Sequence, residues 1–157
     1  MTILRAITVA HALVLLLTVS APAQEQEKKI KRSDLPPAVE KTVVEQSQGA
    51  SIHGFSREKD NGQTYYEAEL MVDGHSKDIL MDSAGMVVEV EERIPIKSLP
   101  PTVRDGLQAK AGNGKVVKVE TLTKKGKLVA YEAQVLANGH KSEVQVGPNG
   151  KPLDHEE

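Results

Sequence analysis

The sequence contains no cysteine and no tryptophan, and only three tyrosines and one phenylalanine among its 157 residues. Without cysteine the chain cannot form disulfides, hold a metal through thiolates or carry a lipid on a cysteine. A strong excess of one charge is also missing, because the formal net charge is −2. The only sustained basic cluster, Lys28–Arg32, is balanced by Glu25 and Glu27. Nothing in this composition indicates a nucleic-acid partner.

The one long hydrophobic run lies at the N-terminus. Ala6–Val19 is almost entirely apolar, follows Arg5 and precedes the small residues of Ala21–Ala23. This order predicts a secretory signal peptide over residues 1–23. An uncleaved anchor is the alternative, but about fourteen apolar residues are fewer than the roughly twenty that a membrane span needs. We expect a periplasmic or secreted protein with no stable membrane insertion after signal cleavage.

The rest of the chain repeats itself. Leu-Pro-Pro, Tyr-Glu-Ala, Gly-His and a later glycine recur in the same order, shifted by 64 or 65 positions. The matching positions are 35–37 and 99–101, 66–68 and 131–133, 74–75 and 139–140, and 85 and 150. Several anchors in one register indicate a duplicated unit. We therefore divide the chain into a polar leader (24–32), a first repeat (33–93) and a second repeat (94–157).

Each repeat begins as a helix and continues as strands. The prolines suit a first helical turn, and apolar residues spaced by four follow them. Alternating apolar and polar residues then indicate half-buried antiparallel strands, and Asp-Gly or Asn-Gly pairs indicate hairpins. The expected strands are 51–57, 64–72, 75–81 and 86–92, then 115–122, 128–136, 140–146 and 151–156.

The fold class predicted from these elements is α+β, with two tandem repeats, each a helix packed on a four-stranded antiparallel meander. The two sheets are expected to join edge to edge as one eight-stranded surface, with two separate sheets as the alternative. The helix would cover the apolar face of each meander and leave the other face open.

This order of elements resembles the PepSY-like repeats, whose fold is related to that of beta-lactamase inhibitor protein. LPPAVEKTV and LPPTVRDGL carry the resemblance in the helices, and the segments around Tyr66–Ala68 and Tyr131–Ala133 carry it in the strands. The resemblance implies an exported, non-enzymatic module that binds, inhibits or modulates a secreted or envelope protein such as a protease. It implies no catalytic residues and no cofactor. Pro152 departs from the pattern, because proline in a strand belongs at an edge or a bulge.

No reactive arrangement is visible in the sequence. There is no G-x-S-x-G motif, and the serines stand at caps, turns and exposed strand positions. Glu89, Glu91 and Glu92 could supply a pair of carboxylates for acid–base catalysis. We interpret them instead as a charged strand edge that discourages aggregation. The chain is therefore not expected to be an enzyme.

Histidines supply an alternative function. His75 and His140 are equivalent in the two repeats, and hairpin geometry would bring them near acidic residues, with His155 beside His140. Such a cluster could bind a divalent metal and make the protein an envelope metal-ion sensor or buffer. Copying of one ancestral turn histidine explains the same pattern without a metal.

Aromatic residues suggest where a partner would bind. Tyr66 and Tyr131 are predicted to face the core, whereas Tyr65 is predicted on the open face beside Met71. An exposed aromatic residue next to a methionine is a common anchor in interfaces. The alternative is that Tyr65 simply packs over neighbouring strands. The function favoured from sequence is therefore a binding module for a protein or peptide in the cell envelope, with Tyr65 and Met71 as candidate contacts.

Overall fold

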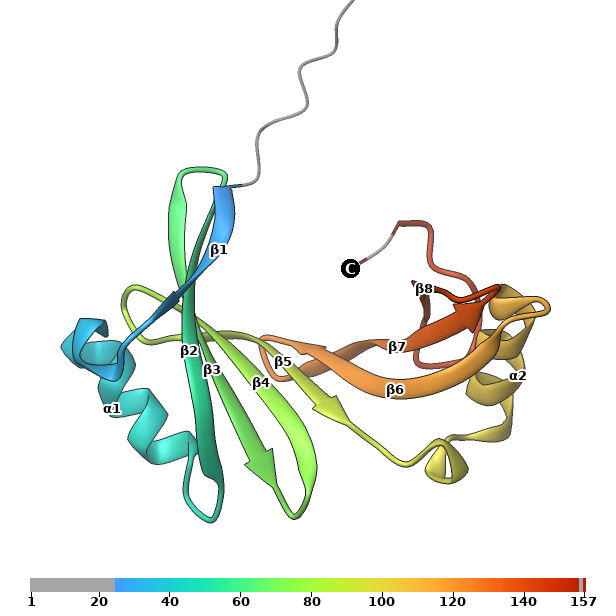
Figure 1. The fold of residues 1–157 in the computed structure, drawn as a ribbon, viewed down its shortest axis with the longest axis horizontal. Coiled ribbons are helices and arrows are strands. Elements are labelled where there is room, and N and C mark those ends of the chain that lie inside the picture. The colour runs from blue at the N-terminus through green and yellow to red at the C-terminus, as the bar shows by residue number, and fades with distance from the viewer. Residues whose placement is uncertain (1–24, 156) are drawn as a thin grey trace, which may run out of the picture.

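The computed structural model describes residues 25–155 and 157, and within them it forms one antiparallel sheet of eight strands in the order of the chain (Figure 1). The strands are β1 (Glu25–Ile30), β2 (Ser51–Asp60), β3 (Gln63–Val72), β4 (His75–Asp82), β5 (Val87–Arg93), β6 (Lys115–Lys124), β7 (Lys127–Ala137) and β8 (His140–Val146). The helices are α1 (Pro37–Gln46) and α2 (Pro101–Ala111), which the 3-10 turns η1 (Arg32–Asp34) and η2 (Ile96–Ser98) precede. No helix among these residues is long and apolar enough to cross a membrane.

Four tight hairpins connect the strands as the sequence predicts. Their two central residues are Asn61-Gly62, Asp73-Gly74, Lys125-Gly126 and Asn138-Gly139. All eight residues have positive φ angles. This is the type I′ geometry, whose twist matches that of the flanking strands.

Both helices cover the same face of the sheet. Val39 and Val43 of α1 pack on strands β2–β4 in one apolar cluster, and Val103 and Leu107 of α2 pack on β6–β8 in a second. Val90 joins the first cluster, and Ile94, four positions later, joins the second. Side chains an even number of positions apart along a strand point to the same face, so both clusters and both helices lie on one face of the sheet. The opposite face carries no helix. Figure 1 shows α1 beside β2 and β3, and α2 beside β6–β8.

The predicted fold class is right in being α+β and wrong in its division into two four-stranded meanders. Three strands, not four, follow α2, because the segment expected as a strand over 151–156 contains none among the residues described. Pro152 has no N–H to donate to a neighbouring strand. The eighth strand is β1, which lies within the expected polar leader 24–32 and pairs with β2. The predicted signal peptide, residues 1–23, lies outside the described residues.

The last turn of each half fits directly under a helix. Gly85, after β4, has its Cα against the carbonyl oxygen of Ala38 in α1, and Gly150, after β8, lies in the same way against Thr102 in α2. Both glycines have positive φ angles, +79° and +78°. A β-carbon at either position would lie within 2.4 Å of a helix carbonyl oxygen. These two close approaches hold the strands against the helices.

Candidate functional site

The face of the sheet opposite the helices carries a row of carboxylates. Odd-numbered positions of β3 and β5 and even-numbered positions of β4, β6 and β7 point to this side, away from the two apolar clusters. We call the following set the acidic row: Glu67 and Glu69 on β3, Asp78 on β4, Glu89 and Glu91 on β5, Glu120 on β6 and Glu132 on β7. The row crosses five neighbouring strands.

Strand register places several of these carboxylates directly opposite one another. Asp78 lies between Glu69 on one side and Glu91 on the other. Glu120 and Glu132 are likewise direct partners across β6 and β7. Like charges opposite each other in an antiparallel pair are destabilising. The sheet therefore brings negative charges together where packing alone would favour neutral residues.

The outer members of the acidic row have partners. Ser56 donates a hydrogen bond of 2.8 Å to Glu67, and the side-chain amide of Gln145 donates one of 2.8 Å to Glu132. Lysines pair with the others: Lys29 with Glu69, Lys124 with Glu89 at 3.6 Å, and Lys118 with Glu120 at 2.5 Å. Oε1 of Glu120 accepts no hydrogen bond. Lys118 and Glu120 form an ion pair.

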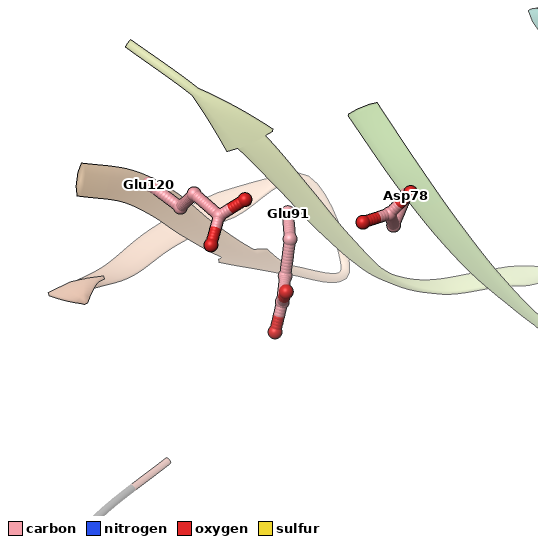
Figure 2. Close-up of side chains that lie close together, drawn as sticks. All are labelled: Asp78, Glu91 and Glu120. Carbon is pink, nitrogen blue, oxygen red and sulfur yellow. The ribbon is translucent and has the colours of Figure 1, made fainter. Parts of the chain in front are cut away.

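The two carboxylates at the centre have no such partner. Within the part of the chain that the structure describes, the side chains of Asp78 and Glu91 accept no hydrogen bond and form no ion pair. Figure 2 shows Asp78, Glu91 and Glu120 reaching from three adjacent strands toward a common space. One carboxylate oxygen of each lies within 4.8 Å of the others. Negative charge is thus concentrated at Glu91 without a counter-charge.

Burial intensifies this concentration. Glu91 is half-buried and stands opposite Leu122, which is 3% exposed. Loss of solvent raises the pKa of Glu91 to about 7, and repulsion from Glu132, Glu120, Glu89 and Asp78 adds to the rise. Burial is also the main cause of the raised pKa of Glu58, Glu67, Asp78 and Glu132. Carboxylates with raised pKa values gathered on one surface are a common sign of a functional site.

Two hollows follow the acidic row. A small one of about 150 Å³ is lined by Glu67, Asp78 and Glu91 among others. A larger, open groove of about 810 Å³ includes Tyr65, Lys124 and Glu157 in its lining. Glu58, Leu80 and Glu89 line both hollows, so the hollows are continuous. Four members of the acidic row, Glu67, Asp78, Glu89 and Glu91, therefore line these hollows.

Asp78, Glu91 and Glu120 are the residues that could hold a metal. They are the only group of three or more candidate ligands among the described residues. Oxygen ligands suit Ca²⁺ or Mg²⁺, but Ca²⁺ takes six to eight of them. The ammonium of Lys118 already lies on Glu120. The arrangement therefore supplies fewer free oxygen ligands than Ca²⁺ requires.

The predicted partner-binding residues share this face but lie apart on it. Tyr65 and Met71 are both on β3 but six positions apart, which is about 20 Å along a strand. Tyr65 lines the larger groove and its hydroxyl donates to Oε1 of Gln63 at 2.6 Å. Met71 lines a third hollow, of about 300 Å³, which Glu67, Glu69 and Asp78 of the acidic row also line. Tyr65 and Met71 therefore do not lie side by side as expected, although each borders a hollow that members of the acidic row line.

The histidines are not brought together. His75 begins β4 opposite Val72, beyond the end of the β4–β5 pairing that starts at Lys77. His140 begins β8 opposite Ala137 and is exposed, and His155 lies in the irregular segment after β8. Among the described residues no histidine belongs to a group of metal ligands. The predicted approach of His75 to Glu89 and Glu91 does not occur.

The sequence interpretation missed the acidic row. Glu89 and Glu91 were expected at a charged edge, but β5 lies in the middle of the sheet, between β4 and β6. Glu92 faces the other side, where it pairs with Lys77 at 3.9 Å. Alternation within each strand did indicate which glutamates share a face. The pairing of β5 with β6, which brings Glu91 near Glu120, has no local signal in the sequence.

Comparison with known proteins identifies similar folds and no family. No protein-family model matches the chain, and no curated protein matches it. Among solved structures, a DUF2874 family protein from Bacteroides ovatus is similar with a TM-score of 0.61 and 20% identity, over 76% of this chain and 85% of that one. A candidate periplasmic protein from Bacteroides eggerthii gives 0.63 and 18%, over 76% and 86%.

A third similar structure is a BLIP-like protein from Bacteroides fragilis, with a TM-score of 0.57 and 23% identity over 78% of this chain and 86% of that one. This likeness agrees with the predicted relation to the fold of beta-lactamase inhibitor protein. The predicted periplasmic or secreted location agrees with the description of the Bacteroides eggerthii protein. Membership of the PepSY-like family itself stays a prediction.

Proposed function

We propose that this protein is an exported, non-enzymatic binding module that holds an envelope or secreted protein on the sheet face opposite its helices. The observation that carries the proposal is the unpaired charge at Asp78 and Glu91, which the fold concentrates at a cost in stability. A surface that is kept in spite of such a cost is expected to be stabilised by a partner. The groove beside Tyr65 gives that partner a place to lie.

The remaining features of the proposal come from sequence and similarity. The N-terminal pattern supports export, and the Bacteroides eggerthii neighbour supports a periplasmic setting. The BLIP-like neighbour and the PepSY-like resemblance support protein binding, with inhibition or modulation of a secreted hydrolase as one form of it. The alternative, a metal sensor or buffer using His75, His140 and His155, has no support among the described residues, in which no histidine belongs to a group of three or more candidate ligands.

Two tyrosine substitutions test whether binding occurs on this face. Tyr65→Ala should reduce capture of a specific protein from an envelope extract by about tenfold and leave the melting temperature nearly unchanged, because Tyr65 borders the groove. Tyr131→Ala should lower the melting temperature, because Tyr131 packs against the α2 cluster. Capture is measured with immobilised protein, and melting by circular dichroism.

The matched control is Val44→Ala, a substitution of an exposed residue of α1 on the opposite side of the sheet. It should change neither capture nor melting. Equal capture by the wild type and the Tyr65→Ala variant would show that the partner binds elsewhere.

A further inference from the structure

We propose that the occupant of the groove is a cationic segment of a protein, rich in lysine or arginine, whose charged groups lie over Asp78 and Glu91. The inference rests on the proposed function and specifies the chemistry of the partner. It begins from the balance of charge on the open face. Seven carboxylates form the acidic row, three lysines, Lys29, Lys118 and Lys124, pair with its members, and Arg93 lies opposite Glu120 in the strand register.

The lysines already on this face show the contact that the partner would make. Wherever a lysine of the chain reaches the acidic row, its ammonium lies against a carboxylate, as Lys118 does on Glu120 and Lys124 on Glu89. None of the lysines in these pairs forms an ion pair with Asp78 or Glu91, although Lys118 and Lys29 attract Asp78 over a longer distance. An ammonium or guanidinium group from a partner would complete the same pattern. Arginine suits this place, because its planar fork can bond two carboxylate oxygens at once.

The dimensions of the acidic row set the length of the segment. The row runs from β3 to β7, which is four steps between strands or about 19 Å. An extended chain advances about 3.3 Å per residue, so roughly six residues span the row and eight exceed it. The continuous hollows, of about 150 and 810 Å³, extend from Glu91 to the neighbourhood of Tyr65. An extended basic segment can therefore cross the strands with its side chains toward the carboxylates.

An octa-arginine peptide with blocked ends is the probe that tests this inference. The full protein is titrated with fluorescent peptide at about 150 mM salt, which screens weak surface attraction. The double variant Asp78→Asn, Glu91→Gln should bind at least about tenfold more weakly than the wild type, because both unpaired charges are gone. An octa-glutamate peptide should not bind.

A second double variant controls for total charge. Glu45→Gln, Asp105→Asn removes two negative charges from exposed positions on α1 and α2, on the opposite side of the sheet. It should change affinity by less than about twofold. Equal weakening in the two double variants, or no measurable binding of octa-arginine to the wild type, would overturn the inference. Melting curves of both variants verify the fold.

The two proposals fail in different ways. If octa-arginine does not bind but Tyr65→Ala still abolishes capture of an envelope protein, the binding face stands and its cationic partner is refuted. If octa-arginine binds through Asp78 and Glu91 but the captured protein is retained equally by the Tyr65→Ala variant, the cationic site stands and the proposed function fails.

Discussion

Gly150→Ala and Gly85→Ala are each expected to destabilise the protein by about 3–5 kcal/mol, enough to unfold a marginal domain. A β-carbon at Gly150 would lie 2.1 Å from the carbonyl oxygen of Thr102, and one at Gly85 would lie 2.4 Å from that of Ala38. In both places the obstacle is helix backbone, which cannot move aside as a side chain can. The positive φ angles add to the strain.

The control for this prediction is Gly139→Ala. Gly139 also has a positive φ angle, +80°, but no atom lies within 4 Å of the position of its added β-carbon. Its substitution should cost only about 1 kcal/mol, the conformational penalty alone. Urea denaturation of the three variants measures the difference. Similar losses in the free energy of unfolding at all three positions would show that the contact between turn and helix is unimportant.

Protonation of Glu91 is expected to stabilise the fold, so that the free energy of unfolding is about 2 kcal/mol higher near pH 5 than near pH 8. The pKa of Glu91 is raised in the folded protein from an ordinary 4.5 to about 7. A carboxyl whose folded pKa is raised gives stability that is fully present below the unfolded pKa and is lost as the pH rises through the folded one. The pH window is therefore about 4.5 to 7.

Glu91→Gln isolates this effect from other titrating groups. The variant should be more stable than the wild type near pH 8, because glutamine removes the buried charge and its repulsion from Asp78, Glu89, Glu120 and Glu132. Near pH 5 the two proteins should approach the same stability. Urea denaturation at both pH values measures the difference. A Glu91→Gln variant less stable than the wild type near pH 8 would show that the charge is compensated.

Local signals in the sequence explain why much of the fold could be predicted. Proline pairs preceded both helices, and glycine pairs such as Asp73-Gly74 fixed the hairpins. The errors came where tertiary contacts decide. β1 has few apolar residues and exists because it completes the edge of β2. The segment around Pro152 was assigned as a strand by analogy with the first half, although its neighbour Gly150 is held against α2.

The candidate site was harder to predict for the same reason. Alternation in β3 and β5 indicated that Glu67, Glu69, Glu89 and Glu91 would face away from the helices. Their effect depends on which strands are neighbours. Glu120 approaches Glu91 only because the connection through α2 returns the chain beside β5. Neither this pairing nor the burial of Leu122 beside Glu91 can be read from spacing alone.

The most direct test of a charged binding face is the titration of Glu91 itself, followed by NMR of its side-chain carboxyl carbon. The account predicts a pKa near 7 in the free protein. It also predicts that a saturating amount of octa-arginine lowers this pKa, because a cation beside the carboxylate favours its ionised form. A Glu91 that titrates near 4.5 in the free protein, and does not respond to the peptide, would contradict it.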